Sequence, residues 1–209
     1  MISAQPRPTA VTSAAQSFER AAGVCAVLAG GVSLAYSVAF VVLQNAGLSA
    51  AMLLAAGLLS TAVVVGLYGR LRRADDLGAI WVLALGLVGA AGSAVHGAYD
   101  LANAINPPDA NLLSLASLPN QVDPRGLLAF GVTGIAMLGA GALARGGALP
   151  RGLAWLTVLL GVLLVMIYLG RLIVLTASSP IILIPAVLAG LVVNPVWNVW
   201  LGLNLLRGR

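Results

Sequence analysis

Long apolar stretches separated by short polar segments make up most of this chain. A helix that crosses a bilayer needs about 20 predominantly apolar residues. Six stretches reach that length: residues 21–44, 48–69, 77–102, 126–144, 153–176 and 181–206. None of them alternates apolar and polar positions as the strands of a membrane barrel do. Because a bilayer accepts only helices and closed barrels, the pattern predicts an all-α transmembrane bundle of six helices over residues 21–206.

Two segments outside the expected spans are longer than turns. Residues 1–20 are polar and predict a cytoplasmic N-terminal tail, and residues 103–125 form the longest connection, an expected extracytoplasmic loop. Within that loop, Asp109 is a residue type that caps helices, and four leucines follow it by position 118. A short helix at the membrane interface and a loosely packed loop are both open for residues 109–118.

Composition supports lipid as the surrounding solvent. The chain is 60% hydrophobic and only 8% charged, with a mean hydropathy of +1.02, whereas a soluble domain carries about 25% charged residues. All eleven basic residues are arginine, and they lie at the ends of the expected spans rather than in one patch. The basic composition therefore indicates orientation in a membrane, with membrane lipids and no nucleic acid as partners.

Arginines are distributed unequally between the two sides of the expected membrane. One side receives Arg7, Arg20, Arg70, Arg72, Arg73, Arg145, Arg151, Arg207 and Arg209, and the other receives Arg125 and Arg171. In membrane proteins the cytoplasmic segments carry the excess of positive charge. We therefore expect both termini in the cytoplasm and the 103–125 loop outside.

One histidine and one aspartate, His96 and Asp100, lie near the end of the third expected span. His96 follows Asp76 by twenty residues, and Arg171 follows Arg151 by the same number. At about 1.5 Å per residue, both lie about 30 Å from the cytoplasmic charges, which is the thickness of the hydrocarbon core. His96 and Arg171 are therefore expected at the same level, near the outer boundary of the membrane, with Asp100 one turn further out.

Two interpretations of this cluster are open. Small residues, among them Gly89 and Gly97, recur on the adjacent face of the third span, and such faces let a neighbouring helix approach closely. In the functional interpretation, Asp100 pairs with Arg171 beside an outward-facing pocket, and His96 binds a ligand or exchanges protons. In the structural interpretation, the ion pair only ties two helices together, or Arg171 extends to the lipid head groups.

The sixth expected span contains a second candidate, the stretch NPVWNVW that starts at position 194. Pro195 has no backbone N–H, so the carbonyl of Leu191 loses its partner and a kink is expected. Asn194 and Asn198 lie one turn apart on the same face. These amides either line a cavity or coordinate an ion, as in the broken helices of transporters, or they satisfy the freed carbonyl and hold neighbouring helices together.

Several chemistries find no support in the sequence. A metal site normally needs three or more His, Cys or carboxylate ligands, and the chain has a single histidine and a single cysteine, Cys25. No metal or other cofactor is therefore expected. Ser93, His96 and Asp100 lie on one short helical stretch, which does not give a nucleophile and its base their usual geometry. We therefore expect a protein that is not an enzyme.

The end of the chain resembles that of small six-span bacterial integral membrane proteins of unknown function. The resemblance rests on the stretches ALPRGLAWLTVLLGVLLVMIYLG and NPVWNVWLGLNLLR, which belong to the last two spans. It implies a location in the bacterial cytoplasmic (inner) membrane, and it carries over no catalytic residues.

Three functions follow from these candidates. The leading one is a multi-pass membrane protein whose outer polar cluster serves helix packing or binds a partner or a small ligand, with a second copy and another membrane protein both open as partners. A small transporter or channel subunit would need a cavity that reaches Asn194 from one side. A membrane enzyme acting on a lipid at the outer interface would need His96 and a carboxylate to converge on an open pocket. A packing role would need these groups paired and closed off.

Overall fold

Helices account for all the regular structure in the computed structural model, which describes residues 10–107, 122–174 and 179–208. Within this part of the chain, six helical segments are long and apolar enough to cross a membrane. They are Gln16–Val42, Ala46–Leu71, Asp76–Ile105, Pro124–Ala148, Arg151–Ile173 and Pro180–Arg207. The all-α prediction of six spans is confirmed, and this is the architecture of a multi-pass membrane protein. The stretch 109–118 lies outside the described residues.

The six spans are assembled from shorter elements. The first three spans are α1 (Ala10–Ser37) with the π-helical turn η1 (Val38–Val42), α2 (Ala46–Leu71) and α3 (Asp76–Ile105). The fourth span consists of η2 (Pro124–Gly126), η3 (Leu127–Val132), α5 (Thr133–Leu143) and η4 (Ala144–Ala148). The fifth is α6 (Arg151–Ile173), and the sixth consists of α7 (Pro180–Leu188), η5 (Ala189–Val193) and α8 (Asn194–Arg207).

Polar side chains define where two of the helices begin. Asn45 Oδ1 accepts a hydrogen bond from the N–H of Leu48 at 2.9 Å, and Asp75 Oδ1 accepts one from the N–H of Gly78 at 3.2 Å. Such caps satisfy N–H groups that the first turn of a helix leaves unpaired. At the N-terminus the helix begins earlier than expected, at Ala10, so part of the expected tail is helical. Alanine has a high helix propensity, which favours extension of the helix from the apolar run toward the N-terminus.

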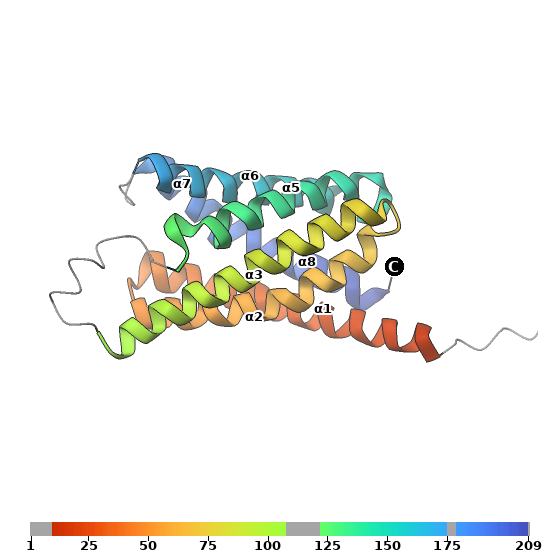
Figure 1. The fold of residues 1–209 in the computed structure, drawn as a ribbon, viewed down its shortest axis with the longest axis horizontal. Helices are drawn as coiled ribbons and strands as arrows, with labels where there is room; N and C mark the ends of the chain where they lie inside the picture. The colour runs from red at the N-terminus through yellow and green to blue at the C-terminus, as the bar shows by residue number, and fades with distance from the viewer. Residues whose placement is uncertain (1–9, 108–121, 175–178, 209) are drawn as a thin grey trace, which may run out of the picture.

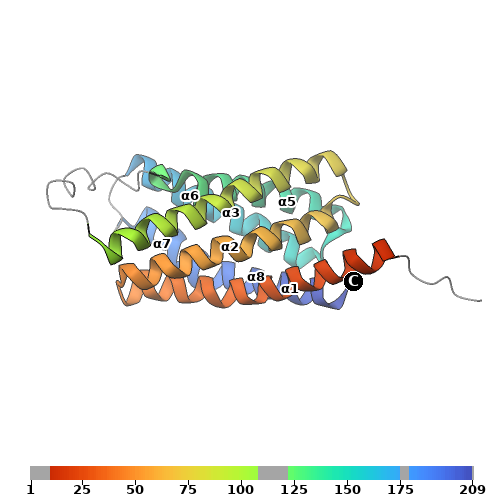
Figure 2. The same cartoon turned by 60° about the horizontal axis from the view of Figure 1, so that its bottom comes forward.

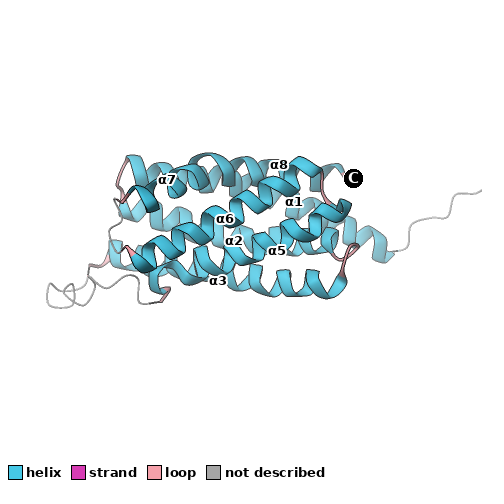
Figure 3. Cartoon of the chain, turned by 90° about the horizontal axis from the view of Figure 1, so that it is seen from above, coloured by secondary structure: helices cyan, strands magenta, loops and turns pink. Residues whose placement is uncertain are grey.

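The spans lie side by side in an elongated bundle, which Figures 1, 2 and 3 show from three directions. In Figure 1 the start of α1 and the end of α8 lie at one end of the bundle, and the end of α3 lies at the opposite end. We call these the terminal end and the loop end. The turn between α2 and α3, which carries Arg72 and Arg73, lies at the terminal end as well.

Reciprocal glycine contacts hold three pairs of helices together. A Cβ added at Gly57 of α2 would lie 2.4 Å from the backbone nitrogen of Ala94 in α3. A Cβ added at Gly97 of α3 would lie 2.4 Å from the backbone nitrogen of Leu54 in α2. The two backbones therefore touch at both points, as small residues allow in membranes. The corresponding contacts are made by Gly23 and Gly202 between α1 and α8, and by Gly134 and Gly161 between α5 and α6.

The terminal end of the bundle is closed by side chains. Arg70 is buried, forms an ion pair with Glu19, and donates from Nη2 to the carbonyl of Asn204 at 3.3 Å. Deeper in the bundle, the indole of Trp197 donates to Oγ1 of Thr157 at 2.8 Å. Five leucines fill the space between these contacts and are almost fully buried: Leu67, Leu71, Leu153, Leu201 and Leu205. The loop end differs, because the bundle is hollow there.

Candidate functional site

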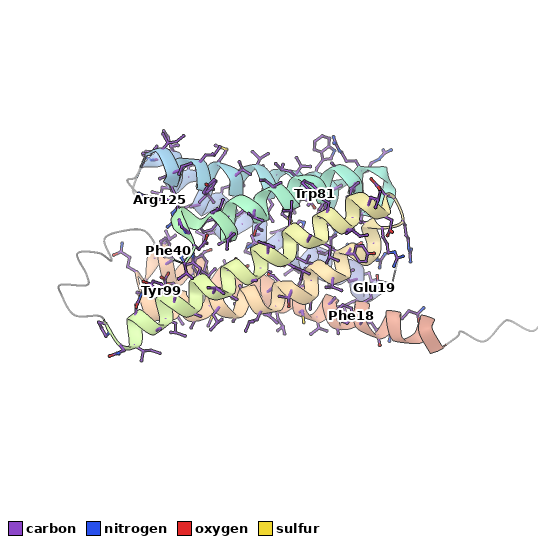
Figure 4. All side chains as sticks on the ribbon, viewed as in Figure 1. Phe18, Glu19, Phe40, Trp81, Tyr99 and Arg125 are labelled. Carbon is purple, nitrogen blue, oxygen red and sulfur yellow. The ribbon has the colours of Figure 1, made fainter. Side chains whose placement is uncertain are left out.

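A cavity of about 640 Å³ lies at the loop end of the bundle. Its walls come from α1 and η1, the start of α2, the end of α3, η3, the end of α6, α7, η5 and the start of α8. Four of the six residues singled out in the sequence line it, namely His96, Asp100, Arg171 and Asn194. Figure 4 shows another lining residue, Phe40, at this end of the molecule. The structure therefore brings parts of both candidate clusters to one cavity.

His96 lies between two carboxylates. Its Nδ1 is 3.0 Å from Oδ2 of Asp123, and its Nε2 is 3.2 Å from Oδ2 of Asp100. The side chain of Asp100 is 44% exposed, whereas those of His96 and Asp123 are 8% and 1% exposed. The three groups therefore form a chain that runs from a buried carboxylate, through the imidazole, to a carboxylate at the cavity. Such a chain can fix the imidazole in one orientation and hold or pass a proton.

Asp123 is the member of this chain that the sequence analysis did not single out. Its Oδ1 accepts from the N–H of Leu128 at 2.7 Å, and its Oδ2 accepts from the N–H of Ala129 at 3.2 Å. Burial by itself would raise the pKa of the Asp123 carboxyl, but the hydrogen bonds from His96, Leu128 and Ala129 outweigh burial and hold that pKa below its usual value. Asp123 therefore both caps the start of η3 and anchors His96.

A local signal for Asp123 is present in the sequence. The residue stands directly before Pro124 and a long apolar run, and Asp before a Pro-initiated helix is a common capping pattern. The chain turns sharply at this point, with positive φ values of 60° at Arg125 and 77° at Gly126. The pattern therefore indicates a helix start at Asp123, but the carboxylate accepts from residues five and six positions on rather than from the first turn after Pro124. Its contact with His96 in turn depends on how two spans pack.

Arg171 does not form the ion pair with Asp100 on which the functional interpretation and one form of the structural interpretation relied. Within the described residues no carboxylate oxygen lies within 4.0 Å of its guanidinium, and Asp100 binds His96 instead. The guanidinium lies over the ring of Phe130, 5.5 Å from the ring centre. This cation–π contact involves no carboxylate, and Arg171 also lines the cavity. Asp100 and Arg171 are therefore separate charges on the walls of one cavity.

The polar residues of the sixth span are divided between two cavities. Asn198 Nδ2 donates to Oδ1 of Asn194 at 2.7 Å and to the carbonyl of Asn194 at 3.1 Å. Asn194 lines the large cavity, both asparagines line a smaller cavity of about 130 Å³, and Pro195 is buried. The kink expected at Pro195 takes the form of the π-helical turn η5, in which the N–H of Asn194 donates to the carbonyl of Ala189.

The smaller cavity continues the large one toward the middle of the bundle. The two share several lining residues, among them Tyr36 and Phe130. Hydroxyl-bearing residues on the walls of the smaller cavity include Ser33, Ser93 and Thr133, and each of these three donates to a carbonyl of its own span at 3.1 Å. These oxygens therefore keep lone pairs that can accept hydrogen bonds from a guest molecule.

Three π-helical turns border the large cavity. Phe40 comes from η1, Phe130 from η3 and Gly190 from η5. Each such turn adds a residue to the helical register, and turns of this kind are frequent at functional sites. Here they mark the level at which the helices separate around the hollow.

The part of the chain that the structure describes holds no group of three or more His, Cys, Asp or Glu side chains suited to a metal ion. Both ring nitrogens of His96 already face carboxylate oxygens. Searches for known relatives gave nothing further: no family model, no curated protein and no solved structure matches this chain. The function must therefore be inferred from the cavity itself.

Proposed function

We propose that this multi-pass membrane protein binds a small amphiphilic ligand in the cavity at its loop end, without a reaction on that ligand. The observation that carries the proposal is the cavity itself, with a volume of about 640 Å³ and charged side chains among an apolar lining. Ligand sites in proteins typically measure about 300–1,000 Å³ and combine apolar walls with a few polar groups.

The lining matches the two parts of an amphiphile. His96, Asp100 and Arg171 provide the polar contacts, and residues such as Leu164 and Ile167 provide apolar surface. A packing role alone would require the polar groups to be paired and closed off. Arg171 instead has no carboxylate partner among the described residues, and Asp100 is 44% exposed.

A transporter is the second candidate, and the position of Asn194 favours it. A transport pathway requires a cavity that reaches this residue from one side, and Asn194 lines both cavities. Beyond the smaller cavity, however, Leu67, Leu71, Leu201 and Leu205 close the terminal end. A transport cycle would have to open that packing, whereas binding requires no such change.

An enzyme is the weaker candidate. His96 and a carboxylate do converge on the cavity, but the hydroxyl of Ser93 donates to the carbonyl of Gly89 rather than to the imidazole. A nucleophile must lie within hydrogen-bonding reach of its base. The combination of Ser93, His96 and Asp100 therefore lacks the contact that hydrolysis would need.

Filling the cavity tests the binding proposal. We expect the purified protein, analysed by native mass spectrometry from mild detergent, to carry a bound lipid or other amphiphile. Ala186 of α7 lines the cavity, so Ala186→Trp should displace this ligand. Leu188 lies on the same helix, is 41% exposed and is not among the cavity-lining residues, so Leu188→Trp should retain it. Full occupancy in a folded Ala186→Trp variant would contradict the proposal.

We also propose that the protein lies in a bacterial cytoplasmic membrane with its loop end outside. The excess of arginine at the terminal end supports this orientation. With Cys25 replaced by alanine, a single cysteine at Asn106 should react with a membrane-impermeant maleimide on intact cells. A single cysteine at Ala74, in the turn between α2 and α3, should react only after permeabilisation. The opposite labelling pattern would reverse the orientation.

A further inference from the structure

The large cavity carries separate positive and negative charges. Arg171, near the end of α6, is the positive group, and Asp100, near the end of α3, is the negative one. Both residues line the same cavity, as does Tyr36. The two charges therefore share one hollow, yet they do not neutralise each other by direct contact, since no oxygen of Asp100 lies within 4.0 Å of the guanidinium.

The positive group is arranged to hold an anion. A guanidinium has five N–H donors, and its edge suits the paired oxygens of a phosphate or carboxylate. The guanidinium of Arg171 lies 5.5 Å from the centre of the Phe130 ring, and no carboxylate among the described residues pairs with it. The contact with Phe130 is a cation–π contact, which needs none of the N–H donors.

The negative group is arranged to hold a cation. Asp100 and Asp123 together contribute two negative charges, and His96 between them contributes at most one positive charge. The chain of three groups therefore keeps a net negative charge in either protonation state of the imidazole. Asp100 is its exposed member, and a carboxylate has lone pairs for an ammonium as well as for the imidazole.

Apolar residues occupy much of the remaining wall. Leu53, Leu164, Ile167, Ile182 and Leu183 line the cavity and come from α2, α6 and α7. Such a surface favours a hydrocarbon chain over a hydrated solute.

From these three features, and building on the proposed binding function, we infer that the ligand has a zwitterionic head group with a primary ammonium and a phosphate, attached to an apolar chain. The phosphate binds Arg171, and the ammonium binds Asp100. A phosphoethanolamine lipid of the surrounding bilayer has this chemistry, and so does a soluble phosphoethanolamine compound.

Lipid selectivity measures both contacts at once. In nanodiscs of equal parts phosphoethanolamine, phosphocholine and phosphoglycerol lipids, native mass spectrometry should show the phosphoethanolamine lipid enriched on the protein. The trimethylated choline group has no N–H to donate to Asp100, and the glycerol head group has no positive charge. The loss of one such contact with the head group lowers affinity by about ten- to a hundredfold.

Two variants test the phosphate contact and the ammonium contact separately. Arg171→Gln should weaken binding of all three lipids about tenfold or more, because the phosphate is common to them. Asp100→Asn is nearly isosteric and should abolish the preference for phosphoethanolamine while the phosphoglycerol lipid still binds. Arg125 lies at the same end of the molecule and does not line the cavity, so Arg125→Gln should leave the selectivity unchanged.

The outcomes distinguish this inference from the proposed function. Retention of lipid without preference among the three head groups, or a preference that survives in Asp100→Asn, would overturn the zwitterionic ligand and leave amphiphile binding intact. No lipid on any variant, together with no binding of glycerophosphoethanolamine in solution, would overturn both. Binding of glycerophosphoethanolamine with the same dependence on Asp100 and Arg171 would support the head group and identify a soluble source.

Discussion

Replacing Asp123 with alanine is expected to lower the free energy of unfolding by about 3 kcal/mol, because it removes the buried one of the two carboxylates that face the largely buried imidazole of His96. His96 is 6% exposed and Asp123 is fully buried. The same substitution removes the acceptor for the N–H groups of Leu128 and Ala129, and loss of a helix cap costs about 1 kcal/mol.

The variant Asp100→Ala is the control that shows whether the loss of stability is specific to the buried carboxylate. Asp100→Ala removes the exposed partner of the same histidine, and exposed ion pairs contribute only about 0–1 kcal/mol. Thermal and denaturant unfolding in detergent micelles, followed by circular dichroism, measures both variants. Equal losses for Asp100→Ala and Asp123→Ala would show that the buried carboxylate does not anchor the site.

Asp123 also makes stability depend on pH in a defined direction. Its pKa in the folded protein lies below its usual value, so the carboxylate contributes stability above the unfolded pKa of about 4. That contribution is lost as the pH falls through the folded pKa. The difference in stability between the unmodified protein and Asp123→Ala should therefore shrink as the pH falls below about 4.

The second large effect is expected at the contact between α2 and α3. A Cβ at Gly57 would lie 2.4 Å from the backbone nitrogen of Ala94 and 2.8 Å from the carbonyl oxygen of Ala90. Because both are backbone atoms, the helices must move apart. We expect Gly57→Ala to cost about 2–3 kcal/mol, and Gly57→Val more.

Gly31 provides the matched control, because nothing lies within 4 Å of a Cβ added there. Gly31→Ala makes the same chemical change in an open part of a helix, where alanine is more favourable than glycine by about 1 kcal/mol. It should therefore be neutral or stabilising in the same unfolding measurements. A Gly57→Ala variant as stable as Gly31→Ala would contradict the close approach of the two helices.

The six spans could be predicted from the sequence because each is a continuous apolar run whose length is set by the membrane. Helical rise also predicts a common level for His96 and Arg171, since it fixes how far each lies from the charges at the terminal end. In the structure both residues line the same cavity.

What could not be predicted depends on rotation and packing. Gly97 of α3 contacts α2, but Gly89 contacts Thr133 of the fourth span, so the small residues of α3 serve two neighbours. Asp100 and Arg171 are close in level, yet a cavity lies between their helices and His96 is the nearer partner. Asp123 reaches His96 through a turn with positive φ values at Arg125 and Gly126, which no apolar periodicity reveals.

The π-helical turns at the cavity have a consequence for how each span meets its surroundings. In η5 the N–H of Asn194 donates five residues back, to Ala189, and in η3 that of Thr133 donates five residues back, to Leu128. One added residue rotates everything beyond it by about 100° about the helix axis. A single span can thus present one stripe to lipid near its middle and a different stripe near the loop end of the bundle, so that substitutions in the two halves are free to accumulate independently.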